Sequence, residues 1–257
     1  MTRHIPFEGI HNFRDFGGYR AGERQLRTGR LYRSANHAYA TDADLEKLAA
    51  MNLAVIVDLR RPNEREREPC RRWEGFAAQV IDNDIREERD DEWRDFIASS
   101  DLSVESFRRY MLDYYRLAPF WARHLDLYAR YFRALAEVDG PVLVHCAAGK
   151  DRTGVICALT HHMAGVHDDD ILHDYLLTND PERMAARLPF MRDHVREISG
   201  KEASDEALLT GMGVAAEYLE ESFAAMRERY GSLDGYLERA LGLDGRLRER
   251  IHDKLLA

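Results

Sequence analysis

The stretch Pro141-Val-Leu-Val-His-Cys-Ala-Ala-Gly-Lys-Asp-Arg-Thr-Gly154 decides the fold of this chain. Its apolar residues 142–144 predict a short buried strand, and a helical pattern begins at Thr153. A loop therefore joins a strand to a helix, with five residues between Cys146 and Arg152. In open α/β sheets such loops lie at the carboxyl ends of the strands, where ligands bind.

Residues 146–152 have the composition of a cradle for a phosphate dianion. Their backbone N–H groups can point inward, and the helix N-terminus adds partial positive charge. The planar guanidinium of Arg152 can bind two phosphate oxygens. The same positive field favours the thiolate of Cys146, which can attack the phosphorus of a bound monoester and form a cysteinyl-phosphate intermediate. The residues expected to hold the phosphate are Ala147, Ala148, Gly149, Lys150 and Thr153.

The alternative for Cys146 is a buried structural thiol at a strand end. That alternative leaves the neighbouring glycine, lysine and arginine unexplained, so we interpret Cys146 as a nucleophile. Cys70, in a charged loop, and Cys157, in an apolar helical segment, are interpreted as structural. Three cysteines without paired spacing predict no disulfide framework and indicate a reducing compartment.

Composition narrows the class of protein. The 257 residues are 45% hydrophobic and 32% charged, enough to bury a substantial core. The net charge of −9 argues against broad nucleic-acid binding. No apolar run approaches the roughly 20 residues of a membrane span, and the N-terminus lacks the apolar core of a signal peptide. We expect a cytoplasmic enzyme without integral membrane association, although secretion without a signal peptide leaves no trace in a sequence. The oligomeric state stays open.

Strand and helix patterns alternate in the first two thirds of the chain. Residues 53–59 predict a second buried strand and residues 77–81 a third, while Thr41 and Asp44 form a capping box before a helix. Aromatic residues at helical spacing over 119–137 are interpreted as core. The expected fold is α/β, with a mostly parallel central sheet flanked by helices.

The C-terminal half is predicted to be almost entirely helical. Because no Pro/Gly/Ser linker divides the chain, we expect one domain over 1–257. The helical segments are expected at 168–177, 181–198, from Ser204, 213–230, 232–240 and 244–256. The charged stretch 82–95 is expected to be a solvated helix or loop near the site entrance.

The segment His145-Cys-x-x-Gly-Lys-Asp-Arg-Thr-Gly154 resembles the signature loop of the Cys-dependent protein tyrosine phosphatases. Its Lys-Asp pair resembles a bacterial and fungal branch that includes dual-specificity and phosphoinositide phosphatases. Further segments similar to this family run from about residue 7 to 243. They are Asn12-Phe-Arg-Asp-Phe-Gly-Gly18, Leu31-Tyr-Arg-Ser-Ala35, Val57-Asp-Leu-Arg60 with Glu64, and Tyr230-Gly-Ser-Leu-Asp-Gly-Tyr236.

The resemblance implies a phosphatase-like fold and protein-tyrosine phosphatase activity. It also implies activity on other phosphorylated proteins or on phosphoinositides, and a helical lid over 181–210. Ordinary packed surface helices are the alternative to a lid. The chemistry requires no cofactor and no metal, and the histidines near residue 165 complete no metal-ligand spacing. A catalytically silent phosphate-binding module is the main alternative function, and a rhodanese-like sulfur transferase is a remote one.

A general acid is needed to protonate the leaving group. The chain has no Trp-Pro-Asp tripeptide of the kind that many tyrosine phosphatases carry on a separate loop. Resemblance to the Lys-Asp-Arg branch assigns this role to Asp151, and a carboxylic acid beside a bound dianion holds its proton more tightly. The alternative is that Asp151 only pairs with Lys150 or Arg14. Asp82 and Asp84 are the other candidates.

Charged residues near the loop have expected supporting roles. Asp58, at a strand end, can bind Lys150, contact a substrate hydroxyl or act as a structural cap. Arg60 and Glu64 are expected to form an ion pair. Lys150, as an additional cation, can take a second phosphate and so extend the substrate range beyond phosphotyrosine.

Polar residues within the loop stretch and in an N-terminal segment are expected to support the loop. His145 is expected to form a local hydrogen bond that positions the loop, and Thr153 to donate its hydroxyl to the sulfur. Asn12, Arg14 and Asp15 are expected to brace the loop from behind. Gly17-Gly18 is expected to form a turn with positive φ.

Overall fold

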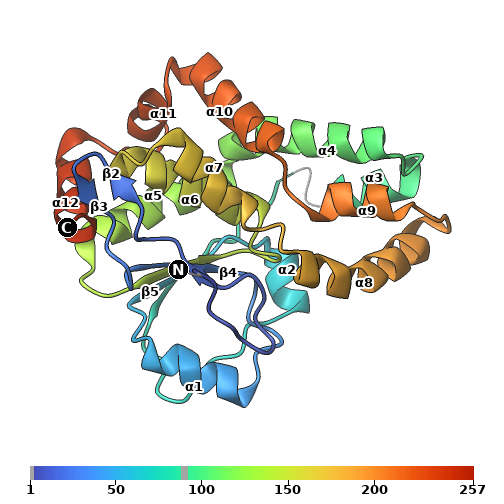
Figure 1. The fold of residues 1–257 in the computed structure, drawn as a ribbon, viewed down its shortest axis with the longest axis horizontal. Helices are drawn as coiled ribbons and strands as arrows, with labels where there is room; N and C mark the ends of the chain where they lie inside the picture. Colours follow the sequence, from blue (N-terminus) through green and yellow to red (C-terminus); the bar gives the residue numbers. More distant parts are fainter. Residues whose placement is uncertain (1–2, 88–91) are drawn as a thin grey trace.

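A mostly parallel sheet forms the centre of the computed structural model, which describes residues 3–87 and 92–257 (Figure 1). Five strands lie in the order β1-β4-β7-β5-β6. Only β1 is antiparallel to its neighbour, and the other pairs are parallel. The strands are β1 (Arg14–Asp15), β4 (Leu31–Ser34), β5 (Val55–Asp58), β6 (Gln79–Ile81) and β7 (Val142–His145), and a separate hairpin joins β2 (Arg20–Ala21) to β3 (Arg24–Gln25). The sheet confirms the predicted fold class.

The register of the sheet brings three polar residues to its carboxyl edge. Asp58 of β5 and Ser34 of β4 both pair with His145 of β7. The preceding residues of β5 and β7 are apolar and fully buried, as expected for parallel strands covered on both faces. Polar side chains at this edge therefore come from the ends of strands whose apolar residues anchor them.

Helices cover both faces of the sheet. Helix α1 (Asp42–Ala50), below the sheet in Figure 1, packs Leu45 and Leu48 against β5 and β7 residues in one apolar cluster. On the other face, α5 (Ala122–Glu137) and α6 (Asp151–Ala164) contribute to the largest cluster. Thr41 and Asp44 form the predicted capping box, with the Asp44 N–H 3.2 Å from Thr41 Oγ1.

The C-terminal half is helical, as predicted. Helices α3, α4, α8 and α9 share a third apolar cluster at the far end of the molecule from the C-terminus (Figure 1). The remaining helices are α2 (Pro62–Arg67), α3 (Glu92–Ser99), α4 (Val104–Leu117), α7 (Asp168–Leu176), α8 (Pro181–Ser199), α9 (Asp205–Met212), α10 (Ala216–Tyr230), α11 (Leu233–Arg239) and α12 (Gly245–Leu255). The single-domain organisation and the lid stay predictions.

Several boundaries differ from the sequence-based expectation. The helix expected from residue 119 begins at Ala122, because Trp121 is extended and a separate 3₁₀ turn, η1 (Ala118–Phe120), precedes it. Helix α10 begins at Ala216, three residues after the extended Gly213. Strand β4 and helices α2 and α4 were not expected. In the charged stretch 82–95, residues 88–91 lie outside the described part of the chain, and α3 begins at Glu92.

Candidate active site

The loop between β7 and α6 has the strand–loop–helix form predicted for it. Helix α6 begins at Asp151, two residues before the expected Thr153, and the Gly154 N–H donates to the Lys150 carbonyl at 2.7 Å. Asp151 and Arg152 therefore lie in the first helical turn. Cys146, at the end of β7, is 2% exposed. A cradle of this form presents backbone N–H groups and a helix N-terminus to an anion.

Gly149 is required by the shape of the loop. Its φ is +66°, a conformation that residues with a Cβ rarely adopt. A Cβ atom at this position would lie 2.3 Å from the Ser34 carbonyl oxygen. The loop consequently packs directly against the end of β4.

The Gly149 carbonyl is held by two side chains from the N-terminal segment. Asn12 Nδ2 donates to it at 2.7 Å, and Arg33 Nη2 donates at 3.0 Å. Arg14 Nη1 in turn donates to Asn12 Oδ1 at 2.6 Å. Asn12 thus bonds the loop directly and Arg14 bonds Asn12, which are contacts of the kind expected for these two residues. Asp15 is different, because it accepts hydrogen bonds from the Gly17 and Gly29 N–H groups.

Asp174 of α7, which the sequence analysis missed, forms ion pairs with both buried arginines. Its carboxylate lies 3.4 Å from Arg14 Nε and 3.0 Å from Arg33 Nη1. Burial raises the pKa of Asp174, but Arg14 and Arg33 outweigh it and lower the pKa to about 2. In the sequence, Asp174 shares a helix face with the apolar Ile171 and with Tyr175, and this signal does not identify its partners.

Arg152 forms a bidentate ion pair that links the loop to α2. Nη1 lies 2.6 Å from Glu64 Oε2, and Nη2 lies 2.8 Å from Glu64 Oε1. Nη1 also donates to the Leu59 carbonyl at 3.1 Å. The expected Arg60–Glu64 pair is therefore wrong. The Arg60–Glu64 pair was expected because the two residues are close in the sequence. The tertiary fold instead brings Arg152 to Glu64.

Arg60 instead binds Asp58. Arg60 Nη2 and Nε donate to the carboxylate at 2.7 and 2.9 Å, and both side chains are about 2% exposed. Of the three roles considered for Asp58, the pair with Lys150 is absent, because Lys150 bonds the Gly211 and Gly213 carbonyls. The buried Asp58 carboxylate is engaged by Arg60, a structural interaction. Burial opposes ionisation of Asp58, but His145 and Arg60 outweigh it and hold its pKa well below the usual range.

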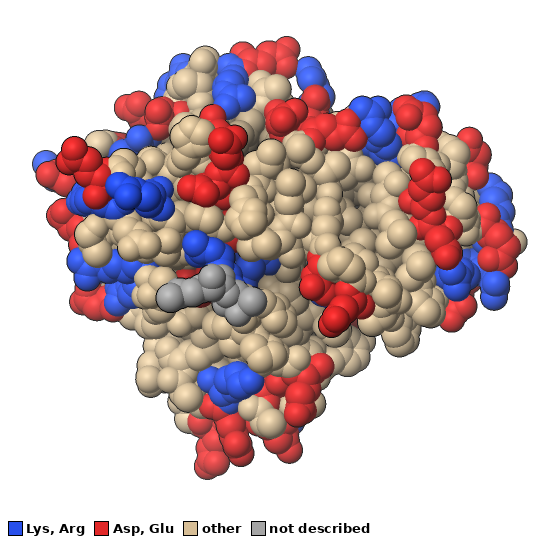
Figure 2. Space-filling model, in the orientation of Figure 1, with Lys and Arg blue, Asp and Glu red and all other residues tan. Residues whose placement is uncertain are grey.

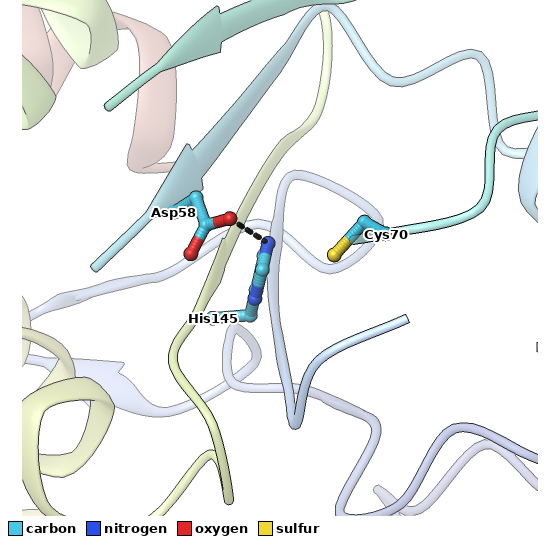
Figure 3. Close-up of side chains that lie close together, drawn as sticks. All are labelled: Asp58, Cys70 and His145. Atoms are coloured by element: carbon cyan, nitrogen blue, oxygen red, sulfur yellow. Dashed lines mark ion pairs between the residues drawn. The ribbon is translucent and has the colours of Figure 1, made fainter. Parts of the chain in front are cut away.

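His145 and Cys70 complete a charged cluster behind the loop (Figure 3). Nε2 of His145 lies 3.7 Å from Asp58 Oδ2, and its Nδ1 lies 3.3 Å from the Cys146 carbonyl oxygen, which confirms the expected local contact. Cys70 Sγ accepts from Arg60 Nη2 at 3.0 Å and from the His37 N–H at 3.4 Å. Cys70 was expected to be a structural thiol, and its sulfur in fact accepts hydrogen bonds from a buried arginine and a backbone N–H.

The same cluster has donor atoms that a metal ion can use. One atom each from Asp58, Cys70 and His145 lies within 4.8 Å of the other two. The Arg60 guanidinium, however, already bonds both Asp58 and Cys70. The positive charge of Arg60 therefore stands where a cation would bind. The three donor atoms fit a hydrogen-bonded network with this arginine better than a metal centre.

Asp151 is held by two donors from different elements. Tyr115 of α4 donates its hydroxyl to Asp151 Oδ1 at 2.8 Å, and Lys150 Nζ lies 3.3 Å from the same oxygen. Tyr175 in turn donates to the Tyr115 hydroxyl at 2.7 Å. Of the two alternative pairings considered for Asp151, the one with Lys150 is present. The tyrosine pair was not expected from the sequence.

Lys150 is more constrained than expected. Its ammonium donates to the carbonyl oxygens of Gly211 and Gly213 at 2.7 and 3.1 Å. These carbonyls flank the end of α9, so Lys150 ties the loop to the C-terminal helices. Its availability for a second phosphate is reduced by these bonds.

The other candidate residues lie as follows. Asp84 binds Arg65 Nη2 at 2.5 Å, Asp82 lies 3.9 Å from Arg65 Nε, and both acids have exposed side chains. Thr153 is fully buried, and its hydroxyl has no hydrogen-bond partner among the described residues, so the expected bond to the sulfur is not formed. Asp82 and Asp84 therefore lie near Arg65, whereas Asp151 begins the helix that follows the Cys146 loop.

The molecular surface carries charges of both signs. Figure 2 shows acidic and basic side chains interspersed over one face, most of them toward its periphery. Among the described helices, none is long and apolar enough to cross a membrane. Cys70, Cys146 and Cys157 are all free thiols.

Comparisons with known proteins agree with the loop chemistry. A family model described as the tyrosine phosphatase family matches residues 5–257. A Cupriavidus necator protein named as a tyrosine-protein phosphatase is 36% identical, with 93% of this chain and 85% of that protein covered. The triple specificity protein phosphatase PtpB of Mycobacterium tuberculosis is 31% identical, with 93% and 94% covered. A tyrosine-protein phosphatase of Nostoc commune is 29% identical, with 80% and 67% covered.

Proposed function

Because the chain belongs to the tyrosine phosphatase family and is a protein-tyrosine phosphatase, we propose that it hydrolyses phosphate monoesters through the Cys146 sulfur. The single observation that carries the proposal is the loop itself. Cys146 ends a buried strand, and Arg152 stands in the first turn of the next helix. The bidentate bond to Glu64 orients the guanidinium beside the position of the phosphate.

The proposed reaction has two steps. The Cys146 thiolate attacks phosphorus, an S–P bond forms and the P–O bond of the ester breaks, while Asp151 gives its proton to the leaving oxygen. Water then attacks the cysteinyl phosphate with Asp151 as the base, the S–P bond breaks and inorganic phosphate leaves. Arg152 and the loop N–H groups stabilise the equatorial oxygens. Tyr115 positions the Asp151 carboxylate.

The proposed substrate range extends beyond phosphotyrosine to phosphoserine, phosphothreonine and phosphoinositides. The name of the PtpB relative, a triple specificity phosphatase, supports this breadth. So does Asp151, because an acid in the loop can protonate a poor alkoxide leaving group. Free thiols favour a reducing compartment, and we place the enzyme in the cytoplasm as part of the same proposal.

The test compares the wild type with Cys146→Ser and, as a matched control, Cys157→Ala, which removes another buried thiol. Phosphate release is measured with phosphotyrosine and phosphoserine peptides and with a phosphoinositide. We expect Cys146→Ser to abolish release and Cys157→Ala to retain it. A phosphorylated cysteine trapped by rapid acid quench and located at Cys146 by mass spectrometry supports the two-step route. Release by Cys146→Ser at the wild-type rate contradicts it.

A further inference from the structure

Two arginines on α8 have no carboxylate partner among the residues that the structure describes, unlike other arginines of the same helix. Arg183 and Arg187 are four residues apart, so they project from the same face of the helix. Further along α8, Arg192 is ion-paired with Asp205. In the described part of the chain, neither Arg183 nor Arg187 forms such a pair, and Nε and Nη2 of Arg183 are buried without an acceptor.

The free donors of Arg183 have a specific geometry. Nε and Nη2 lie on one edge of the guanidinium, and two parallel N–H groups on such an edge bind two oxygens of a phosphate. A buried donor without an acceptor is energetically unfavourable until a ligand supplies one. The unused edge of Arg183 therefore fits an oxyanion.

Other basic side chains lie within electrostatic range of this edge of Arg183. Burial, and then the charges of Arg187 and Arg14, lower the pKa of Arg183 to about 10. Burial also lowers the pKa of Arg187, and the pKa of His11 is lowered by burial and by both α8 arginines. Like charges in a partly desolvated position repel one another, and a bound anion relieves that repulsion.

Arg187 is within electrostatic range of Glu68, which is linked to Ala147 through Asn36. The acid that attracts it is Glu68 at the end of α2, and Figure 1 shows the first turns of α8 beside α2. Glu68 accepts a hydrogen bond from Asn36 Nδ2 at 3.1 Å. The same Asn36 amide donates to the Ala147 carbonyl at 3.2 Å. Arg187 is thus two side chains away from the phosphate loop.

Arg183 is within electrostatic range of the two arginines that support Gly149. It is close enough to Arg14 and Arg33 for their charges to lower its pKa. Arg33 bonds the Gly149 carbonyl directly. Lys150 is bonded to the Gly211 and Gly213 carbonyls, whereas Arg183 has two donors without a partner among the described residues.

We propose that Arg183 and Arg187 form a subsite for a second phosphate group on a compact substrate whose first phosphate occupies the Cys146 loop. The inference rests on the proposed function and narrows its substrate class to bisphosphorylated molecules. An inositol ring with two phosphates holds both dianions at a fixed separation, which suits two cationic sites fixed by the fold. An extended peptide with two phosphates offers a variable separation and suits them less well.

The experiment measures kcat/KM for water-soluble, short-chain phosphatidylinositol monophosphate and bisphosphate, and for para-nitrophenyl phosphate. The variant is Arg183→Gln with Arg187→Gln, and Arg192→Gln on the same helix is the matched control. We expect the wild type and the control to prefer the bisphosphate by about tenfold, mainly through KM, as expected for charge-assisted hydrogen bonds. In the double variant the ratio of the two kcat/KM values falls to about 1, so the preference for the bisphosphate is lost. The value of kcat/KM for para-nitrophenyl phosphate changes less than about twofold.

Binding separates failure of the subsite from failure of the proposed function. Calorimetry with soluble inositol bisphosphate and monophosphate uses Cys146→Ser, with and without the two α8 substitutions. A wild type that is inactive on every ester overturns the catalytic proposal, while tighter binding of the bisphosphate, lost with the substitutions, still supports the subsite.

Three results overturn the subsite. The first is an unchanged bisphosphate preference in the double variant, and the second is no such preference in the wild type. The third is a preference confined to a doubly phosphorylated peptide over its singly phosphorylated form, which excludes the compact substrate. Thermal unfolding checks that the double variant is folded. If the double variant is unfolded, Arg183→Gln and Arg187→Gln are assayed separately. Each single variant is expected to lower the ratio of kcat/KM for the bisphosphate to kcat/KM for the monophosphate.

Discussion

Arg152 and Glu64 form an ion pair through two hydrogen bonds of 2.6 and 2.8 Å, with both side chains largely buried. The pair joins the first turn of α6 to α2, elements that are 88 residues apart at this contact. A guanidinium fixed in this way is oriented before a phosphate arrives, and less ordering is needed in the transition state. Glu64 is therefore a positioning residue for Arg152.

Glu64→Gln should lower kcat/KM for aryl phosphates by about 10- to 100-fold, the effect expected when a charge-assisted hydrogen bond is lost. Glu66→Gln, at an exposed position of the same helix, is the matched control and should have wild-type kinetics. The measurement is steady-state hydrolysis of para-nitrophenyl phosphate. Equal kcat/KM values for Glu64→Gln and the wild type would show that Arg152 needs no such support.

The same pair should make stability depend on pH. Burial raises the pKa of Glu64, but Arg152 outweighs it and lowers the pKa from 4.5 to about 2. Because the folded-state pKa is the lower one, the carboxylate contributes its full stabilisation above pH 4.5, and this is lost as pH falls toward 2. We expect on the order of 3 kcal/mol at neutral pH.

Urea unfolding of the wild type and of Glu64→Gln between pH 2.5 and 7 measures this contribution. The difference in unfolding free energy should be largest near pH 7 and should shrink as the solution is acidified. A difference that stays constant over this range would assign the effect to packing rather than to the charge.

Tyr115→Phe should slow catalysis most where the leaving group is poor. The Tyr115 hydroxyl donates to Asp151 at 2.8 Å and orients that carboxyl group. Its loss should lower kcat by about tenfold for a phosphoserine peptide and by less than about twofold for para-nitrophenyl phosphate, whose leaving group needs little protonation. Tyr131→Phe, which removes a hydroxyl bonded to Thr160 instead, is the control. Equal losses on the two substrates would argue against Asp151 as the acid.

Gly149→Ala should abolish catalysis, since the added Cβ would lie 2.3 Å from the Ser34 carbonyl oxygen at a φ of +66°. The matched control is Gly165→Ala, where φ is +85° but the Cβ would meet no atom within 4 Å. The control should cost only about 1 kcal/mol of stability and should keep its activity. Phosphate release and thermal unfolding measure the two effects. An active Gly149→Ala enzyme would show that the loop tolerates displacement from β4.

Cys70 should react with iodoacetamide as pH rises through neutrality. Burial raises its pKa, but the charges of His145 and Arg60 outweigh it and lower the pKa to about 7. Cys157, whose pKa burial raises to about 12, is an internal control that should stay unmodified. Mass spectrometry of Cys146→Ser after timed alkylation from pH 6 to 9 gives the rate at each thiol. A Cys70 rate that still rises tenfold between pH 8 and 9 would be inconsistent with this cluster.

The sequence by itself determined the strand–loop–helix unit around Cys146, Arg152 and Asp151. Its parts are contiguous, so apolar strand residues, a flexible glycine and a helix start are visible at fixed local spacing. The buried strands at 55–58 and 142–145 and the capping box at Thr41 were predictable for the same reason. Strand β4 was not, because Arg33 and Ser34 interrupt its apolar pattern, and only the buried partner of Arg33 explains its place in the sheet.

Only the tertiary structure decided the partners of each charge. Arg60 binds Asp58 instead of Glu64, and Lys150 is held by carbonyls more than 60 residues away. Asp174 reaches Arg14 across 160 residues. Charged side chains pair with whichever opposite charge the packing of apolar elements places beside them, and sequence spacing carries no record of that distance. The chemistry of the loop is thus local, whereas its support and the second cationic site on α8 depend on the fold.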